Sequence, residues 1–107
     1  YVAAEEAHMV YSIDTAKQVV LKTIKAGQRA NGIAVRPDGK RVFVSNGADG
    51  TVSAIDTAND TVIATIPVGR RPWNMAITPD GKKLYVANGR SNSISVIDSR
   101  WPFGTKP

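Results

Sequence analysis

Residues 31–57 read NGIAVRPDGKRVFVSNGADGTVSAIDT, and residues 73–99 read WNMAITPDGKKLYVANGRSNSISVIDS. The two stretches align without a gap at an offset of 42 residues and are identical at 11 of 27 positions. Most other pairs are conservative, such as Val42 with Leu84 and Phe43 with Tyr85. An Ile-Asp pair ending at Asp14 extends the same register toward the N-terminus. The chain is therefore built from 42-residue repeats.

The complete repeat contains four short segments rich in Val, Ile, Thr and aromatic residues. Turn signals separate them, and we predict strands over Asn31–Arg36, Arg41–Asn46, Thr51–Asp56 and Thr61–Ile66. A period of this length made of short strands is typical of a β-propeller. The predicted fold is all-β, with blades of four antiparallel strands. About two and a half blades are present, whereas a closed ring takes roughly four to eight, so the ring is incomplete.

Two recurring turns support this interpretation. The Pro-Asp-Gly sequence recurs at Asp38 and Asp80, where proline presets φ, Asp bonds nearby amides and Gly takes positive φ. The aspartates that end the third strand, Asp14, Asp56 and Asp98, are expected to cap the turns that follow. We interpret both sets as structural and not as a site.

The repeat register divides the chain. With strands labelled A to D from the channel outward, residues 1–26 hold B, C and D, residues 27–68 a complete blade, and residues 69–98 A, B and C. Residues 99–107 form a non-repeat tail in which Pro102 and Pro107 disfavour a ladder strand. The unpaired edges and apolar faces predict association. We expect a piece of a longer chain, completed by the remaining blades or by further copies.

Composition excludes several classes of protein. Cysteine is absent, which excludes disulfides and thiolate metal sites. The sequence contains no run of roughly 18 apolar residues, so no membrane span is expected, and no basic-then-apolar pattern of a signal segment is seen in it. The net charge of +5 is spread over the repeats. We interpret it as a solvated surface and predict no nucleic-acid partner.

The segments YVAN (85–88), SVID (95–98) and ATIPVG (64–69), with the PDGK hairpins, resemble the YVTN-type β-propeller repeat over residues 1–98. The resemblance implies a seven-bladed parent, exported to the periplasm or the cell surface. It also implies relatives among surface-layer proteins, periplasmic propellers of quinone-cofactor oxidation, lactonases and haem- or copper-containing reductases. Function on such a scaffold is a property of its loops.

In a propeller the D-to-A and B-to-C loops emerge on one face, around the channel mouth. On these loops we select candidates for binding a small ligand or a protein partner: Arg29, Asn31, Arg70, Arg71, Trp73, Asn74 and Arg90. Guanidinium groups suit carboxylates and phosphates, so they could form a cationic rim. The alternative is that each Arg packs on the next blade. Trp73 is either a stacking platform or an inter-blade packing residue.

His8, the only histidine, lies near Glu5 and Glu6 in a B-to-C loop and is a weak metal or base candidate. One histidine with two adjacent glutamates gives no convergent ligand spacing, and no Ser-His-Asp set can be assembled. We therefore predict no catalytic residue, no metal and no cofactor in this part of the chain.

Three functions stay open. The first is an exported, non-catalytic propeller that binds a protein or small ligand. The second is part of a lactonase-like or redox propeller enzyme whose catalytic residues lie in other blades. The third is a structural repeat of a surface layer.

Overall fold

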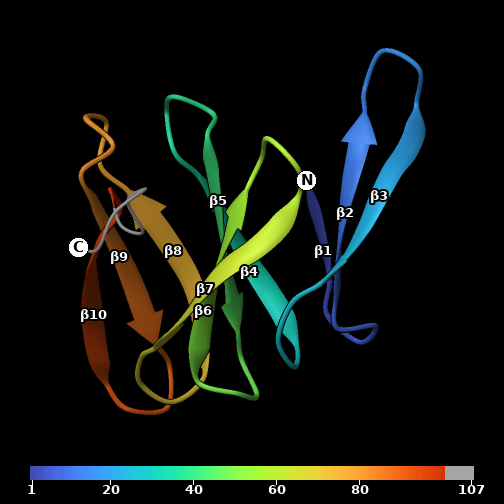
Figure 1. The fold of residues 1–107 in the computed structure, drawn as a ribbon. Coiled ribbons are helices and arrows are strands. Elements are labelled where there is room, and N and C mark those ends of the chain that lie inside the picture. The colour runs from blue at the N-terminus through green and yellow to red at the C-terminus, as the bar shows by residue number, and fades with distance from the viewer. Residues whose placement is uncertain (101–107) are drawn as a thin grey trace.

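A computed structural model describes residues 1–100, and within them every regular element is a β-strand. The ten strands form three antiparallel sheets that stand side by side, without closing into a ring (Figure 1). The predicted fold class, an incomplete propeller of about two and a half blades, is confirmed. Within residues 1–100 no helix is long and apolar enough to cross a membrane.

The middle sheet is the complete four-stranded unit, with the order β4-β5-β6-β7. Its strands are β4 (Ala30–Val35), β5 (Arg41–Asn46), β6 (Thr51–Asp56) and β7 (Thr61–Pro67). The predicted limits of the second and third strands are correct. The first strand begins and ends one residue earlier than predicted, and the fourth extends to Pro67, which pairs with Thr51 at the end of the ladder.

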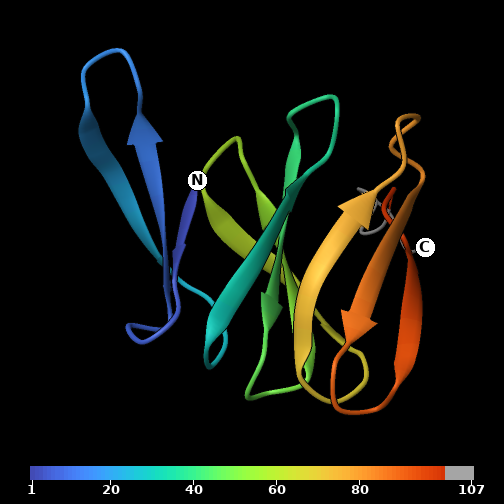
Figure 2. The ribbon, with the colours of Figure 1, turned by 180° about the vertical axis from the view of Figure 1, so that it is seen from behind.

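The flanking sheets have three strands each. The first contains β1 (Val2–Ala4), β2 (Met9–Asp14) and β3 (Val19–Lys25). The third contains β8 (Pro72–Ile77), β9 (Lys83–Asn88) and β10 (Ser93–Asp98). In the view of Figure 2, β4 and β8 are neighbours on the side that faces the viewer. The prediction for the tail concerns residues 99–107, of which 101–107 lie outside the described residues.

Two apolar layers hold the sheets together, one on each face of the middle sheet. Side chains alternate between the faces of a strand, and β5 shows the result: Val42 and Val44 belong to the layer with Val10 of the first sheet, and Phe43 to the layer with Leu84 of the third. All five are fully buried. The middle sheet is thus packed on both faces, as a propeller blade requires.

The predicted turn chemistry is confirmed. Asp38 and Asp80 each accept the backbone N–H two residues ahead at 3.0 Å, and Gly39 and Gly81 adopt φ of 73° and 74°. The aspartates at the ends of β2, β6 and β10 each accept the amide two residues further on, also at 3.0 Å. These residues shape the hairpin end of the molecule, at the top of Figure 1. The candidate site lies at the opposite end.

Candidate functional site

The loop end of the molecule is built from two equivalent loop pairs. Each pair combines the loop that enters an inner strand with the loop that joins the next two strands of the same sheet. In the middle sheet these loops lie before β4 and between β5 and β6; in the third sheet they lie before β8 and between β9 and β10. Both pairs lie at the lower end of the ribbon in Figure 1. The predicted clustering of these loops on one face is confirmed by the bonds between them.

Four hydrogen bonds join the loops of the middle sheet. The Gly27 amide donates to Asn46 Oδ1 at 3.0 Å, and the Gln28 amide donates to Asp49 Oδ2 at 2.8 Å. In the return direction, the Gly47 amide donates to the Arg29 carbonyl at 2.9 Å and the Ala48 amide to the Gln28 carbonyl at 3.2 Å. The loops therefore form one rigid unit, because their backbone groups satisfy each other.

The third sheet repeats the same four bonds. The Gly69 amide donates to Asn88 Oδ1 at 3.1 Å and the Arg70 amide to Ser91 Oγ at 2.6 Å. The Gly89 amide donates to the Arg71 carbonyl at 2.9 Å, and the Arg90 amide to the Arg70 carbonyl at 3.1 Å. These bonds bring the backbones of three arginines together in one loop pair.

Asn46 and Asn88 are the residues on which both loop pairs depend. Each is buried at the end of its strand, and its side-chain amide also donates to two hydroxyl groups of the next strand. A Cβ at Gly27 or Gly69 would lie 2.5 or 2.6 Å from the Asn Cγ, so only glycine fits there. The strand and turn patterns predict no role for these two asparagines, although their recurrence at equivalent positions is a signal for one.

The entry loops hold arginine in a backbone conformation that side chains rarely adopt. Arg29 has φ of 58° and Arg71 has φ of 52°. Left-handed φ is uncommon outside glycine. Its recurrence at a spacing of 42 residues shows that the repeat dictates it, so both side chains leave the loops in the same way.

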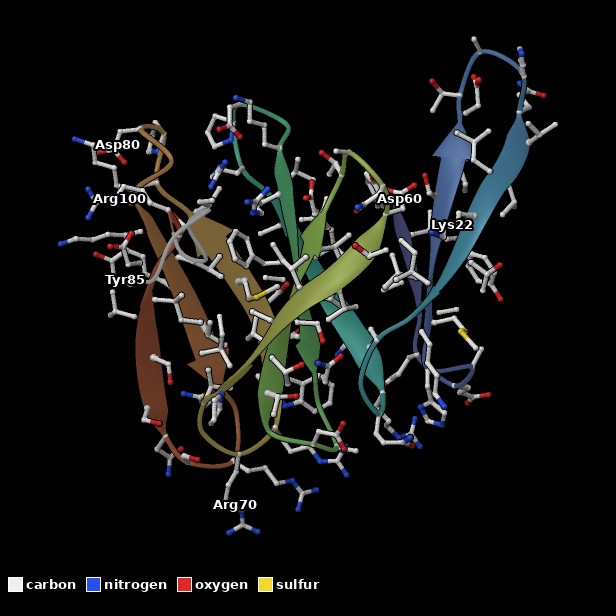
Figure 3. All side chains as sticks on the ribbon, in the orientation of Figure 1. Lys22, Asp60, Arg70, Asp80, Tyr85 and Arg100 are labelled. Atoms are coloured by element: carbon white, nitrogen blue, oxygen red, sulfur yellow. The ribbon has the colours of Figure 1, made fainter. Side chains whose placement is uncertain are left out.

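The two loop pairs differ in the partners of their charged groups. Arg29 lies 3.7 Å from the Glu5 carboxylate, and its amide donates to His8 Nδ1 at 2.8 Å. The guanidinium groups of Arg70, Arg71 and Arg90 have no ion pair or hydrogen bond to any residue within 1–100. Figure 3 shows the Arg70 side chain extending away from the sheets. Within the described residues, the positive charge of the third-sheet loop pair is thus not neutralised, whereas that of Arg29 in the adjacent loop pair is paired with Glu5.

Trp73 lies at the start of β8, with 51% of its surface exposed. Its indole occupies the space above Gly89, where a Cβ would lie 2.3 Å from Cδ1 and 2.4 Å from Nε1. It therefore packs on the backbone of Gly89, which precedes Arg90 and whose amide donates to the Arg71 carbonyl. This places an aromatic face within the arginine-rich loop pair.

The seven predicted binding residues do not form a single cluster. Arg70, Arg71, Trp73 and Arg90 come together at the third sheet. Arg29 belongs to the adjacent loop pair, while Asn31 and Asn74 lie within β4 and β8. Asn74 lines a shallow hollow with Tyr85 and Ile94 on the uncovered face of the third sheet. The candidate site is therefore the third-sheet loop pair alone.

The weak metal candidate is not assembled. Within residues 1–100 no three His, Cys, Asp or Glu side chains converge as metal ligands. Instead His8 accepts the Arg29 amide and Glu5 pairs with Arg29, so both connect the first sheet to the middle one.

A family model described as YNCE-like β-propeller matches residues 15–102. The chain belongs to this family. Its 42-residue repeats are consistent with the YVTN-type repeat that the sequence resembles. A comparison with curated proteins gave no significant match.

Among solved structures, this YNCE-like chain is similar to Kuenenia stuttgartiensis hydrazine synthase, with 35% identity and a TM-score of 0.86 over 89% of this chain and 28% of that one. It is also similar to the dihydro-heme d1 dehydrogenase NirN in complex with DHE (25%, 0.79, 90% and 21%). A Bacteroides fragilis protein classed by name as a 6-phosphogluconolactonase is a third (28%, 0.76, 88% and 30%). The chain spans less than a third of each.

Proposed function

We propose that this chain is part of an exported, non-catalytic β-propeller that binds an acidic partner or anionic ligand through its loop face. The observation that carries the proposal is the set of three arginines, Arg70, Arg71 and Arg90, that lack a partner within residues 1–100. Guanidinium groups form paired hydrogen bonds with carboxylates and phosphates. Three arginines on one loop pair, without a partner within residues 1–100, are therefore suited to such a ligand.

The experiment is isothermal titration calorimetry of the full chain with hexaglutamate at several salt concentrations. The test variant R70Q/R90A removes two loop-face charges. The matched control K40Q/K82Q removes two charges from the hairpin end, at positions that are also equivalent in the repeat. We expect at least about tenfold weaker binding for the test variant, from about 1.4 kcal/mol or more of lost interaction. Unchanged affinity in both variants would refute the proposal.

A second function is favoured by the similarity to hydrazine synthase at 35% identity. In this alternative the chain is one part of a larger redox or lactonase-like propeller enzyme, with its catalytic residues in other blades. The loop face would then hold an anionic substrate or a second subunit. An association with periplasmic quinone-cofactor oxidation and a surface-layer role are further alternatives for the same scaffold. Activity assays of the complete protein with the R70Q/R90A variant separate catalysis from binding alone.

A further inference from the structure

The two loop pairs provide an internal control for the role of the arginines. Their four hydrogen bonds are the same, but Gln28 and Ala48 in the middle sheet correspond to Arg70 and Arg90 in the third. Likewise Asp49 corresponds to Ser91, and both accept the same backbone amide. Because the neutral residues support the same loop geometry, the fold does not require these two arginines.

The tryptophan is also specific to the third sheet. Its equivalent in the middle sheet is Asn31, and the glycine on which it packs corresponds to Gly47. At Gly47 an added Cβ would meet nothing closer than 3.6 Å, whereas at Gly89 it would overlap the indole. Trp73 is thus held against Gly89 in the other loop of its pair, and half of its surface is exposed. Its indole N–H has no hydrogen-bond acceptor within residues 1–100.

From these observations we infer that the third-sheet loop pair binds an acidic peptide segment of a partner protein, in which an aromatic ring lies next to carboxylates. This inference rests on the proposed function and specifies its partner. The arginines bind the carboxylates, and Trp73 stacks on the ring. Ser91 Oγ, which already accepts the Arg70 amide, retains a hydroxyl proton that can bond a further carboxylate oxygen.

The charges around the site favour a short acidic segment over a long polyanion. Asp49 lies in the adjacent loop pair, and Glu5 and Glu6 lie in the loop between β1 and β2, at the same end of the molecule. A nucleic-acid strand that ran across this face would leave the arginines and approach those carboxylates, which repel phosphate. A compact group of carboxylates meets only the cationic end.

The test uses the full chain with Trp101 replaced by Phe, so that Trp73 is the sole tryptophan. Two pentapeptides are titrated: four glutamates around a central tyrosine, and the same peptide with a central alanine. We expect the tyrosine peptide to bind about threefold to tenfold more tightly, from the aromatic contact, and to change Trp73 fluorescence. In W73N, which copies Asn31 of the preceding repeat, the two peptides should bind equally.

The outcomes separate this inference from the proposed function. Equal affinity of the two peptides for the unaltered site, with both weakened by R70Q/R90A, overturns the aromatic inference and leaves the proposed function standing. Failure of both peptides to bind overturns both. Tighter binding of a single-stranded oligonucleotide of equal charge overturns the peptide assignment. A thermal melt of W73N confirms that the variant is folded.

Discussion

The side chain of Asn46 joins the end of β5 to the loop that enters β4, because its Oδ1 accepts the Gly27 amide at 3.0 Å. Its Nδ2 donates to Ser53 Oγ at 2.9 Å and to Thr51 Oγ1 at 3.1 Å. All three bonds use the same buried amide. The shape of the loop face therefore depends on one residue in each repeat.

Replacing Asn46 with alanine should lower the free energy of unfolding by about 2 kcal/mol, because the Gly27 amide loses its acceptor and the hydroxyl oxygens of Thr51 and Ser53 lose a donor. Chemical denaturation measures the change. The exposed Asn59 provides the control, and its alanine variant should cost less than about 0.5 kcal/mol. Equal effects at the two positions would show that the Asn46 bonds do not stabilise the loop pair.

Gly89 and Gly47 form a second matched pair. In Gly89→Ala the added methyl group overlaps the Trp73 indole, which must move, so tryptophan fluorescence should shift. Gly47→Ala meets only ordinary contacts and should leave the spectrum unchanged. Combining Gly89→Ala with W73N should abolish any stability cost of the alanine, as measured in a double-mutant cycle. A spectral shift in Gly47→Ala as large as that in Gly89→Ala would contradict the packing described.

The uncovered face of the third sheet predicts self-association. Tyr85, Ile94 and Val96 correspond to Phe43, Val52 and Ala54, which are fully buried beneath the third sheet. Tyr85 and Ile94 instead expose 41% and 68% of their surfaces. Phe43→Ala should destabilise the chain by about 3–5 kcal/mol. Ile94→Lys should leave the melting temperature nearly unchanged but reduce association in sedimentation velocity, unless this face does not mediate contacts.

Acid titration tests the hairpin end. The hydrogen bond from Arg36 is the main cause that lowers the pKa of Asp38 from 3.8 to about 2. Because the folded pKa is lowered, the stabilising contribution is present above pH 3.8 and disappears as the pH falls toward 2. Arg36→Gln should raise the pKa of Asp38 toward its ordinary value in a carboxyl NMR titration. Asp80, whose pKa is lowered chiefly by Thr78, serves as the control and should not respond.

The sequence was sufficient to predict the strands and turns, because both follow local chemistry that recurs at a spacing of 42 residues. The hairpins at Asp38 and Asp80 and the strand limits of β5 and β6 are examples. Clustering of the two types of loop at one end was predicted from the propeller architecture that this recurrence indicates. The gathering of Arg70 and Arg90 then follows from the repeat register.

Contacts between different repeats could not be predicted in the same way. Glu5 neutralises Arg29, and His8 accepts its amide, yet glycine or asparagine occupies the equivalent positions in the other repeats. The periodic pattern therefore did not predict these contacts. The packing of Trp73 on Gly89 likewise has no counterpart at Asn31 and Gly47. Residues that depart from the repeat acquire their roles from three-dimensional neighbours.

Heteronuclear NMR of the full chain during a titration with hexaglutamate tests the central claim most directly. The account predicts that the side-chain signals of Arg70, Arg71 and Arg90 shift together, while those of Arg36 and Arg41 at the hairpin end stay unchanged. Shifts confined to the hairpin end, or spread equally over all arginines, would contradict a binding site on the third-sheet loop pair.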